Sequence, residues 1–162
     1  MKTVLYHGSS EIIVSPEIRE PNRTLDFGKG FYLTTSREQA ERLVRNRMTT
    51  VWPKGFVNSY SFDMNLLKES LKIKSFGDAN DEWVDFVMKN RMMQGFEHDY
   101  DIVIGPVADD KVYAQFSLFE GGIISKETLV AELKTYKLVD QYLFHTEKSL
   151  KFLEFITHYE VI

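Results

Sequence analysis

The sequence predicts a single α+β domain. Short strand-like runs and capped helices are interspersed along the chain without a regular strand–helix–strand repeat, which disfavours a doubly wound parallel sheet. The 162 residues are 43% apolar and 14% aromatic, a composition that supports one hydrophobic core. Because no linker, internal repeat or low-complexity tract divides the chain, we expect one domain over residues 1–162.

Runs of β-branched and aromatic residues predict the strands. The first covers residues 3–6 and should end at His7 and Gly8, where the apolar run breaks. A weak extended piece is expected at 12–14, inside a loop that reaches Asp26. Further strands are predicted at 30–34, 56–62, 71–76, 102–104, 142–145 and 156–162.

Capping signals predict the helices. Two overlapping capping boxes, Thr35-x-x-Glu38 and Ser36-x-x-Gln39, precede apolar residues at helical spacing. Asp81 is the expected cap of a helix over 81–93. Residues 112–119 are ambiguous between strand and helix, and we favour helix. Two more capped helices are expected at 125–134 and 146–155, the latter carrying Leu150 and Leu153.

Charge and composition exclude several classes of protein. A net charge of −4 and an isoelectric point near 5.6 argue against a protein whose main function is to wrap nucleic acid. A local basic patch is compatible with these values, since four arginines lie within residues 37–47, but a solvated helix face explains them more simply. The absence of cysteine excludes disulfides and thiolate chemistry and fits a reducing cytoplasm.

Neither a leader nor a membrane span is expected. His7 and Gly8 interrupt the N-terminal apolar run before it reaches the length of a signal peptide core, and no apolar run elsewhere approaches membrane-spanning length. We therefore expect a cytoplasmic protein without a membrane partner.

Two segments carry most of the chemical information. Tyr6-His7-Gly8-Ser9 and Asp26 to Thr35 each place an aromatic or imidazole ring beside glycines in a strand-like stretch. A histidine offers a donor and an acceptor, a tyrosine offers a π face, and glycine lets the backbone approach a ligand. These features are typical of a site for a flat, hydrogen-bonding ligand, although two half-buried aromatic side chains filling a cleft would explain them as well.

Other well-known sites are disfavoured. Gly28-Lys29-Gly30 lacks the third glycine of a dinucleotide fingerprint and opens a strand instead of a helix. The chain has no phosphate-binding P-loop, no His-Glu-x-x-His and no Gly-x-Ser-x-Gly. His98, His145 and His158 are scattered, so we expect no metal site.

Taken together, the two segments resemble the first two signatures of the ADP-ribosyltransferase superfamily, in its diphtheria-toxin-like or poly-ADP-ribose-polymerase-like branch with a His-Tyr-Glu triad. More narrowly, nearly the whole chain resembles the bacterial DUF3990 family, whose recurring pieces are matched at 26–35, 81–91, 100–108, 109–114 and 140–146. The resemblance implies an ADP-ribosyltransferase-like α+β fold, with two small antiparallel sheets flanked by helices around an NAD cleft.

The resemblance also implies roles for individual residues. His7 would bond a ribose hydroxyl of NAD, the Gly8 backbone would hold the nicotinamide carboxamide, and the Tyr32 ring would stack on nicotinamide. A cationic pyridinium ring is attracted to an aromatic face. Ser9, Gly28, Lys29 and Gly30 complete the expected NAD-binding set, with Lys29 directed at the pyrophosphate.

The third signature of the superfamily is a strand that begins with a catalytic glutamate, and Gln141 stands at that place. Glutamine keeps a hydrogen bond but lacks the charge that stabilises an oxocarbenium-like ribose and the basicity that activates an acceptor. Asp140, Glu120, Asp109 and Asp110 are candidate bases. A polar residue facing solvent at a strand end is the alternative interpretation of Gln141.

Four functions remain open. The leading one is a mono-ADP-ribosyltransferase that uses NAD as substrate, without metal, and modifies a protein or a nucleic acid; the family resemblance implies a toxin of a toxin–antitoxin or phage-defence pair and a small antitoxin partner. A catalytically silent module that binds NAD or ADP-ribose is the second. RNA 2′-phosphotransferase chemistry is less favoured because the first signature lacks arginine. A purely structural protein is the last.

Overall fold

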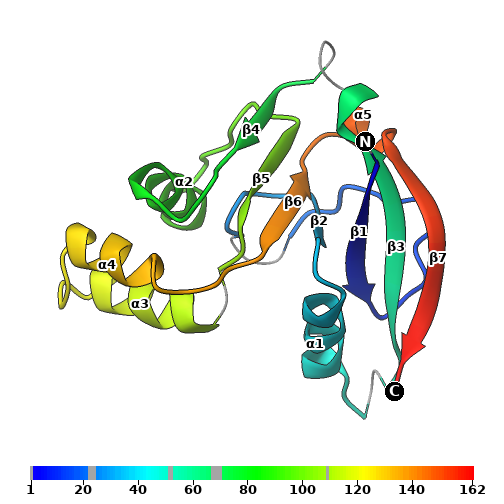
Figure 1. Cartoon of the computed structure of the whole chain (residues 1–162), viewed down its shortest axis with the longest axis horizontal. Helices are drawn as coiled ribbons and strands as arrows, with labels where there is room; N and C mark the ends of the chain where they lie inside the picture. Colours follow the sequence, from blue (N-terminus) through cyan, green and yellow to red (C-terminus); the bar gives the residue numbers. More distant parts are fainter. Residues whose placement is uncertain (1, 22–24, 51–52, 67–70, 109) are drawn as a thin grey trace.

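Seven strands form one mixed sheet in the order β4-β5-β6-β2-β1-β3-β7 (Figure 1). The computed structural model describes residues 2–21, 25–50, 53–66, 71–108 and 110–162. The β4–β5 pair is parallel and the other neighbours are antiparallel. The strands are β1 (Lys2–Ser9), β2 (Phe31–Thr34), β3 (Gly55–Asp63), β4 (Ile73–Ser75), β5 (Ile102–Pro106), β6 (Asp140–Phe144) and β7 (Leu153–Val161). The predicted α+β class is confirmed.

The sheet is almost divided between β1 and β2. These strands share one register pair, Tyr6 with Thr34, whereas β1 pairs with β3 over its whole length. We call this junction the seam. It separates an outer half (β1, β3, β7) from an inner half (β2, β6, β5, β4). The structure therefore has one sheet where two were expected, because a single backbone register pair joins the two halves. A shared core also packs them together, with Phe31 against Tyr60 and Phe62 against Phe144.

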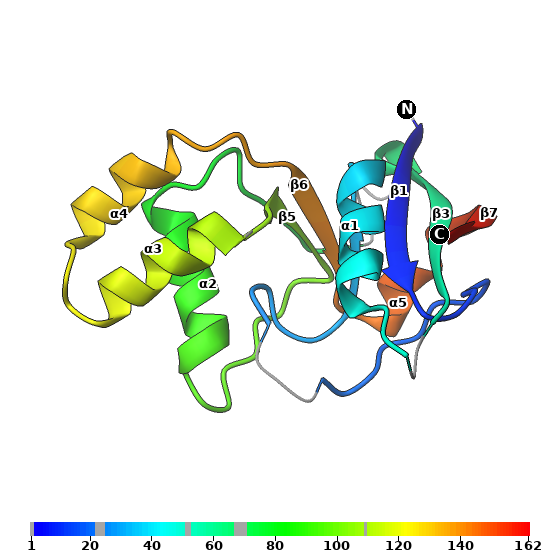
Figure 2. The same cartoon turned by 90° about the horizontal axis from the view of Figure 1, so that it is seen from below.

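Five α-helices and one 3₁₀ turn complete the described fold: α1 (Arg37–Arg47), η1 (Met64–Leu66), α2 (Asp81–Met92), α3 (Asp110–Glu120), α4 (Lys126–Leu133) and α5 (Glu147–Leu150). Helix α1 packs on the outer half through Ala40 and Val44, which contact Val57 and Val161. Helices α2, α3 and α4 gather at the opposite end of the molecule (Figure 2). Their core includes the fully buried Trp83.

The helix starts follow the capping chemistry closely. Of the two overlapping boxes the second is used, since the Ser36 hydroxyl accepts a hydrogen bond from the Gln39 amide. Asn80 caps α2 one residue before the expected Asp81. Ser125 caps α4 as predicted. The helix favoured at 112–119 is confirmed as α3.

Two predicted boundaries are wrong because strand pairing overrides local signals. The helix expected at 146–155 is the single turn α5, since Leu153 already pairs with Phe62 at the start of β7. Strand β1 continues through His7 and Gly8 because β3 pairs with both.

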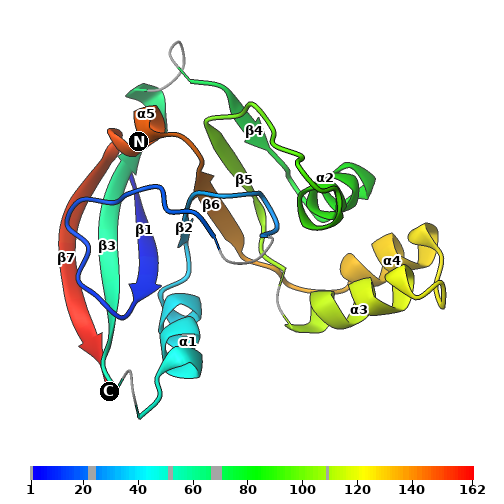
Figure 3. The same cartoon turned by 180° about the vertical axis from the view of Figure 1, so that it is seen from behind.

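No strand forms at 12–14. This stretch belongs instead to the segment that crosses one face of the sheet (Figure 3). There the Ile13 amide donates to Asn58 Oδ1 at 3.0 Å, and Tyr60 Oη donates to the Ile13 carbonyl at 2.6 Å. Side chains of β3 thus supply the hydrogen bonds that a neighbouring strand would otherwise provide.

None of the helices in the described ranges combines the length and apolar character needed to cross a lipid bilayer.

Candidate functional site

A cleft of about 610 Å³ opens at the seam of the sheet. His7 reaches it from β1, Tyr32 from β2 and Gln141 from β6. The cleft falls within the volume range of small-molecule sites, roughly 300–1,000 Å³. The structure therefore brings together the three residues that the sequence predicts as a triad, although they come from widely separated segments of the chain.

His7 is oriented by the neighbouring strand. Its Nδ1 lies 2.6 Å from the Tyr32 carbonyl oxygen, so Nδ1 carries the proton and donates it. The second ring nitrogen, Nε2, therefore carries no proton and is available as a hydrogen-bond acceptor. The imidazole also stacks on Phe31, with ring centroids 4.1 Å apart. The pKa of His7 is lowered to about 4, mainly by burial and to a smaller extent by the charges of Arg47 and Arg19, against the hydrogen bond to Tyr32, which raises it. The ring is therefore neutral near pH 7.

This pKa shift makes the folding free energy depend on pH. The pKa of His7 falls from 6.5 to about 4 on folding, so the unfolded chain binds more protons and stability is lost as the pH decreases from 6.5 towards 4. Allowing for partial exposure, we expect His7 to account for about 1.5 kcal/mol of the stability lost between pH 8 and pH 5. Urea denaturation of the wild-type protein and of His7→Gln at both pH values measures this loss of stability.

The exposed His158 offers a matched control for that experiment. His158→Gln should retain the wild-type dependence of stability on pH, whereas His7→Gln should flatten it. Equal curves for wild type and His7→Gln would contradict the neutral, buried imidazole.

Tyr32 is held as a fixed wall of the cleft. Its hydroxyl donates to the Gly28 carbonyl at 2.5 Å and accepts from the Phe27 amide at 3.0 Å. The ring is half-buried and packs against the core of the inner half. The backbone of Tyr32 is held in β2 and its hydroxyl is held by the two hydrogen bonds. The ring therefore loses little conformational freedom when a ligand stacks on it.

Gln141 lines the cleft and carries a buried donor without a partner in the described part of the chain. It lies opposite Thr34 in the β2–β6 ladder and is only 7% exposed. Within the described part of the chain, its Nε2 is the buried side-chain nitrogen that has no hydrogen-bond partner. An unsatisfied buried donor costs about 1–3 kcal/mol. The low exposure of the side chain contradicts the interpretation of Gln141 as a solvated strand end. The unpaired donor leaves a hydrogen bond available to a ligand once the amide turns toward the cleft.

Residues 27–30, which we call the glycine loop, lie beside the cleft. Three successive backbone carbonyls of this loop accept hydrogen bonds from side chains. His98 Nε2 donates to the Phe27 carbonyl at 2.7 Å, Tyr32 to that of Gly28, and His145 Nδ1 to that of Lys29 at 2.6 Å. The two imidazoles lie against each other, with centroids 4.3 Å apart. Burial lowers the pKa of His98. These histidines support the loop, and no cluster suited to a metal ion occurs among the described residues.

The other residues predicted to bind NAD do not all line the cleft. Gly30 lines the cleft. Gly28 and Lys29 line a separate hollow of about 290 Å³ instead, and Lys29 Nζ lies 3.3 Å from Glu20 and 3.8 Å from Glu97. The ion pairs with these two carboxylates explain why Lys29 does not reach the cleft.

Gly8 and Ser9 belong to the first predicted segment and line a hollow of about 290 Å³ that also includes His7. Gly8 additionally lines a small space of about 100 Å³ with His7, Tyr32 and Gln141, so the structure places it beside the predicted triad. Gly8 has a clear packing role, since a Cβ there would lie 2.6 Å from Val44 Cγ2 and 2.7 Å from the Ala40 carbonyl oxygen. A glycine is therefore needed for α1 to lie close to β1. The Ser9 hydroxyl accepts from the Glu11 amide at 3.2 Å.

Sequence reasoning missed a polar group in the cleft. Asp26 and Tyr113 line the cleft, and the Tyr113 hydroxyl lies 3.3 Å from the buried Asp26 carboxylate. Arg91 pairs with the same carboxylate at 3.6 Å and lies over the Tyr113 ring, 4.7 Å from its centroid. Arg91 is thus turned toward Asp26 and Tyr113. No local pattern joins these three residues, because they come from three distant segments.

Two of the candidate bases named from the sequence, Asp140 and Glu120, are exposed and are not among the residues that line the cleft. Partial desolvation of its carboxylate raises the pKa of Asp140. The other two candidates, Asp109 and the side chain of Asp110, lie outside the described part of the chain.

Comparison with known proteins identifies the family. Among curated proteins, none matches this chain. The family model described as "Protein of unknown function (DUF3990)" matches residues 3–155. The chain therefore belongs to the DUF3990 family.

Proposed function

We propose that the cleft binds NAD and that the protein is a mono-ADP-ribosyltransferase. The observation that carries the proposal is the convergence of His7, Tyr32 and Gln141 on one cleft, with a buried Gln141 amide that lacks a partner in the described structure. The division of the sheet at the seam also agrees with an ADP-ribosyltransferase-like fold, in which the cofactor lies between two groups of strands.

Each of the three groups has a chemical role in this proposal. The Tyr32 ring stacks on the nicotinamide, whose positive charge favours an aromatic face. The unprotonated Nε2 of His7 accepts a hydrogen bond from a ribose hydroxyl. The Gln141 amide donates to an oxygen of the same ribose and so satisfies its own unpaired hydrogen.

The reaction breaks the bond between ribose C1′ and the nicotinamide nitrogen. The bonding electron pair leaves with nicotinamide, which becomes neutral, and an oxygen or nitrogen nucleophile of the acceptor forms the new bond to C1′ and loses its proton. Gln141 supplies no negative charge to the oxocarbenium-like ribose, so a slow, single transfer is favoured over chain elongation. The acceptor is a protein or a nucleic acid, and water is the default acceptor when neither is present.

The test uses NAD labelled in the nicotinamide ring. Tyr32→Ala is expected to reduce nicotinamide release by about 100-fold, because removing a positioning group at the reacting centre costs at least that much. Tyr32→Phe keeps the ring and loses only the bonds to the glycine loop, so it should retain most of the activity. Absence of release by the wild-type protein with every acceptor class would contradict catalysis.

A silent NAD-binding or ADP-ribose-binding module is the second candidate, and glutamine at position 141 favours it. Calorimetry distinguishes the two functions: saturable NAD binding without nicotinamide release supports the module. In either case a small antitoxin partner and a place in a toxin–antitoxin or phage-defence pair in the cytoplasm are proposals that rest on the family resemblance alone.

A further inference from the structure

The four arginines of α1 fall into two pairs with different surroundings. Arg37 lies over the rings of Tyr6 and Tyr159, 5.6 and 5.7 Å from their centroids, and Arg45 pairs with Glu41 at 3.6 Å. Arg42 and Arg47 line the cleft, and neither forms an ion pair with a carboxylate in the described part of the chain. Positive charge without a counter-charge is thus concentrated on one side of the helix.

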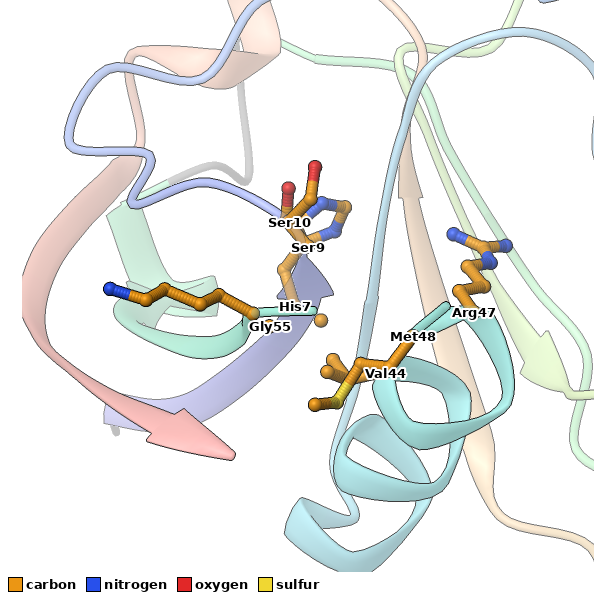
Figure 4. Close-up of a pocket in the computed structure, with 9 residues that line it drawn as sticks. His7, Ser9, Ser10, Val44, Arg47, Met48 and Gly55 are labelled. Atoms are coloured by element: carbon orange, nitrogen blue, oxygen red, sulfur yellow. The ribbon is translucent and has the colours of Figure 1, made fainter. Parts of the chain in front are cut away.

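Arg47 also lines the hollow of about 290 Å³ that Gly8 and Ser9 line (Figure 4). Val44 and Met48 project from α1 toward this hollow and give it an apolar wall. Ser9, Ser10 and Lys54 contribute two hydroxyls and an amine. No aspartate or glutamate is found among its described lining residues.

The described charges that line this hollow are opposite in sign to that of the whole protein. The chain carries a net charge of −4, yet the charged residues among the described lining are Arg47 and Lys54. Guanidinium and ammonium groups with nearby hydroxyls form a suitable donor set for a phosphate, and the guanidinium can bind it through two parallel hydrogen bonds. The apolar wall of Val44 and Met48 offers a packing surface for a nucleobase.

We propose that this hollow binds a phosphate-bearing nucleotide unit of a single-stranded nucleic acid, which is the acceptor of the reaction. The identification as an acceptor rests on the proposed function. The binding itself does not, because the hollow and the cleft that would hold NAD share only His7 and Arg47 among their described lining residues. His7 and Arg47, which line both spaces, join the acceptor site to the reacting ribose.

The test measures fluorescence anisotropy of a labelled oligonucleotide of about 10 nucleotides, within the usual site size of single-strand binders. The double variant Arg47→Gln/Lys54→Gln removes two positive charges from the hollow. The control Arg45→Gln/Lys134→Gln removes the same charge from residues that do not line it.

We expect the first double variant to weaken oligonucleotide binding at least 10-fold and the control less than twofold. The slope of log affinity against log salt should fall by about 1.4 in the first variant, as expected for two lost phosphate contacts on a single strand. Equal losses in both variants, or no binding by the wild-type protein, would overturn the proposal.

Two further arms separate the sources of phosphate and the two proposals. If NAD competes with the oligonucleotide, and the first double variant weakens NAD binding equally, the hollow holds the NAD pyrophosphate and the acceptor proposal fails. Nicotinamide release without oligonucleotide binding refutes this inference alone. Oligonucleotide binding without any NAD binding refutes the proposed function, and with it the acceptor role, but leaves nucleic-acid binding by the hollow standing.

Discussion

Gln141→Glu is expected to raise the rate of nicotinamide release from NAD about 10-fold. Hydrogen bonds with a charged partner are roughly twice as strong as neutral ones, and a carboxylate at this place stabilises positive charge as it develops on the ribose. The side chain is 93% buried in the wall of the cleft, so little water screens the new charge. Steady-state release at pH 8, where the carboxylate is ionised, measures the change.

Gln141→Met is the matched control, because it preserves length and removes the amide. Release should fall about 100-fold. The unliganded protein should at the same time become about 1 kcal/mol more stable, since the unsatisfied amide nitrogen is gone. A variant that loses both activity and stability would indicate that Gln141 has a structural partner, and would contradict a role in binding the ligand.

Gly30→Ala is expected to lower the free energy of unfolding by about 3 kcal/mol. Gly30 has a φ of 150°, which L residues with a side chain rarely adopt. An added Cβ would also lie 2.5 Å from the Phe144 carbonyl oxygen and 3.1 Å from the His145 Cα. Both contacts involve backbone in β6 or directly after it, so neither can be relieved by a side-chain rotation, and overpacking adds to the backbone strain.

Gly77→Ala is the control for this prediction. Nothing lies within 4 Å of a Cβ added at Gly77, and its φ is not positive, so we expect a change below about 0.5 kcal/mol. Urea denaturation followed by circular dichroism compares the two variants. Similar midpoints for Gly30→Ala and Gly77→Ala would show that the approach of the glycine loop to β6 is not as close as described.

Local chemistry made much of this fold predictable. Ser36 and Ser125 cap helices as expected, because a hydroxyl that accepts from an amide three residues on needs no tertiary partner. The boundary of β7 was missed for the opposite reason. Leu153 lies within reach of a helix cap in sequence, but pairing with Phe62, which is remote in sequence, decides its conformation.

Only those residues of the candidate site that belong to sequence motifs could be predicted. His7, Tyr32 and Gln141 were expected together from the family resemblance, and they line one cleft. Lys29 was misplaced because the positions of Glu20 and Glu97 could not be known from spacing. The pairing of Arg91 with Asp26 was missed because an arginine on a helix carries no signal of which distant carboxylate it meets.

The single Tyr6–Thr34 pair has a mechanical consequence. Because so little backbone ladder connects the two groups of strands, the angle between them is set mainly by side chains, among them the bond from the His7 imidazole to the Tyr32 carbonyl. A ligand that contacts both His7 in the outer half and Gln141 in the inner half would link the two halves across the seam. Ligand binding in the cleft would thereby restrict movement of the two halves of the sheet relative to each other.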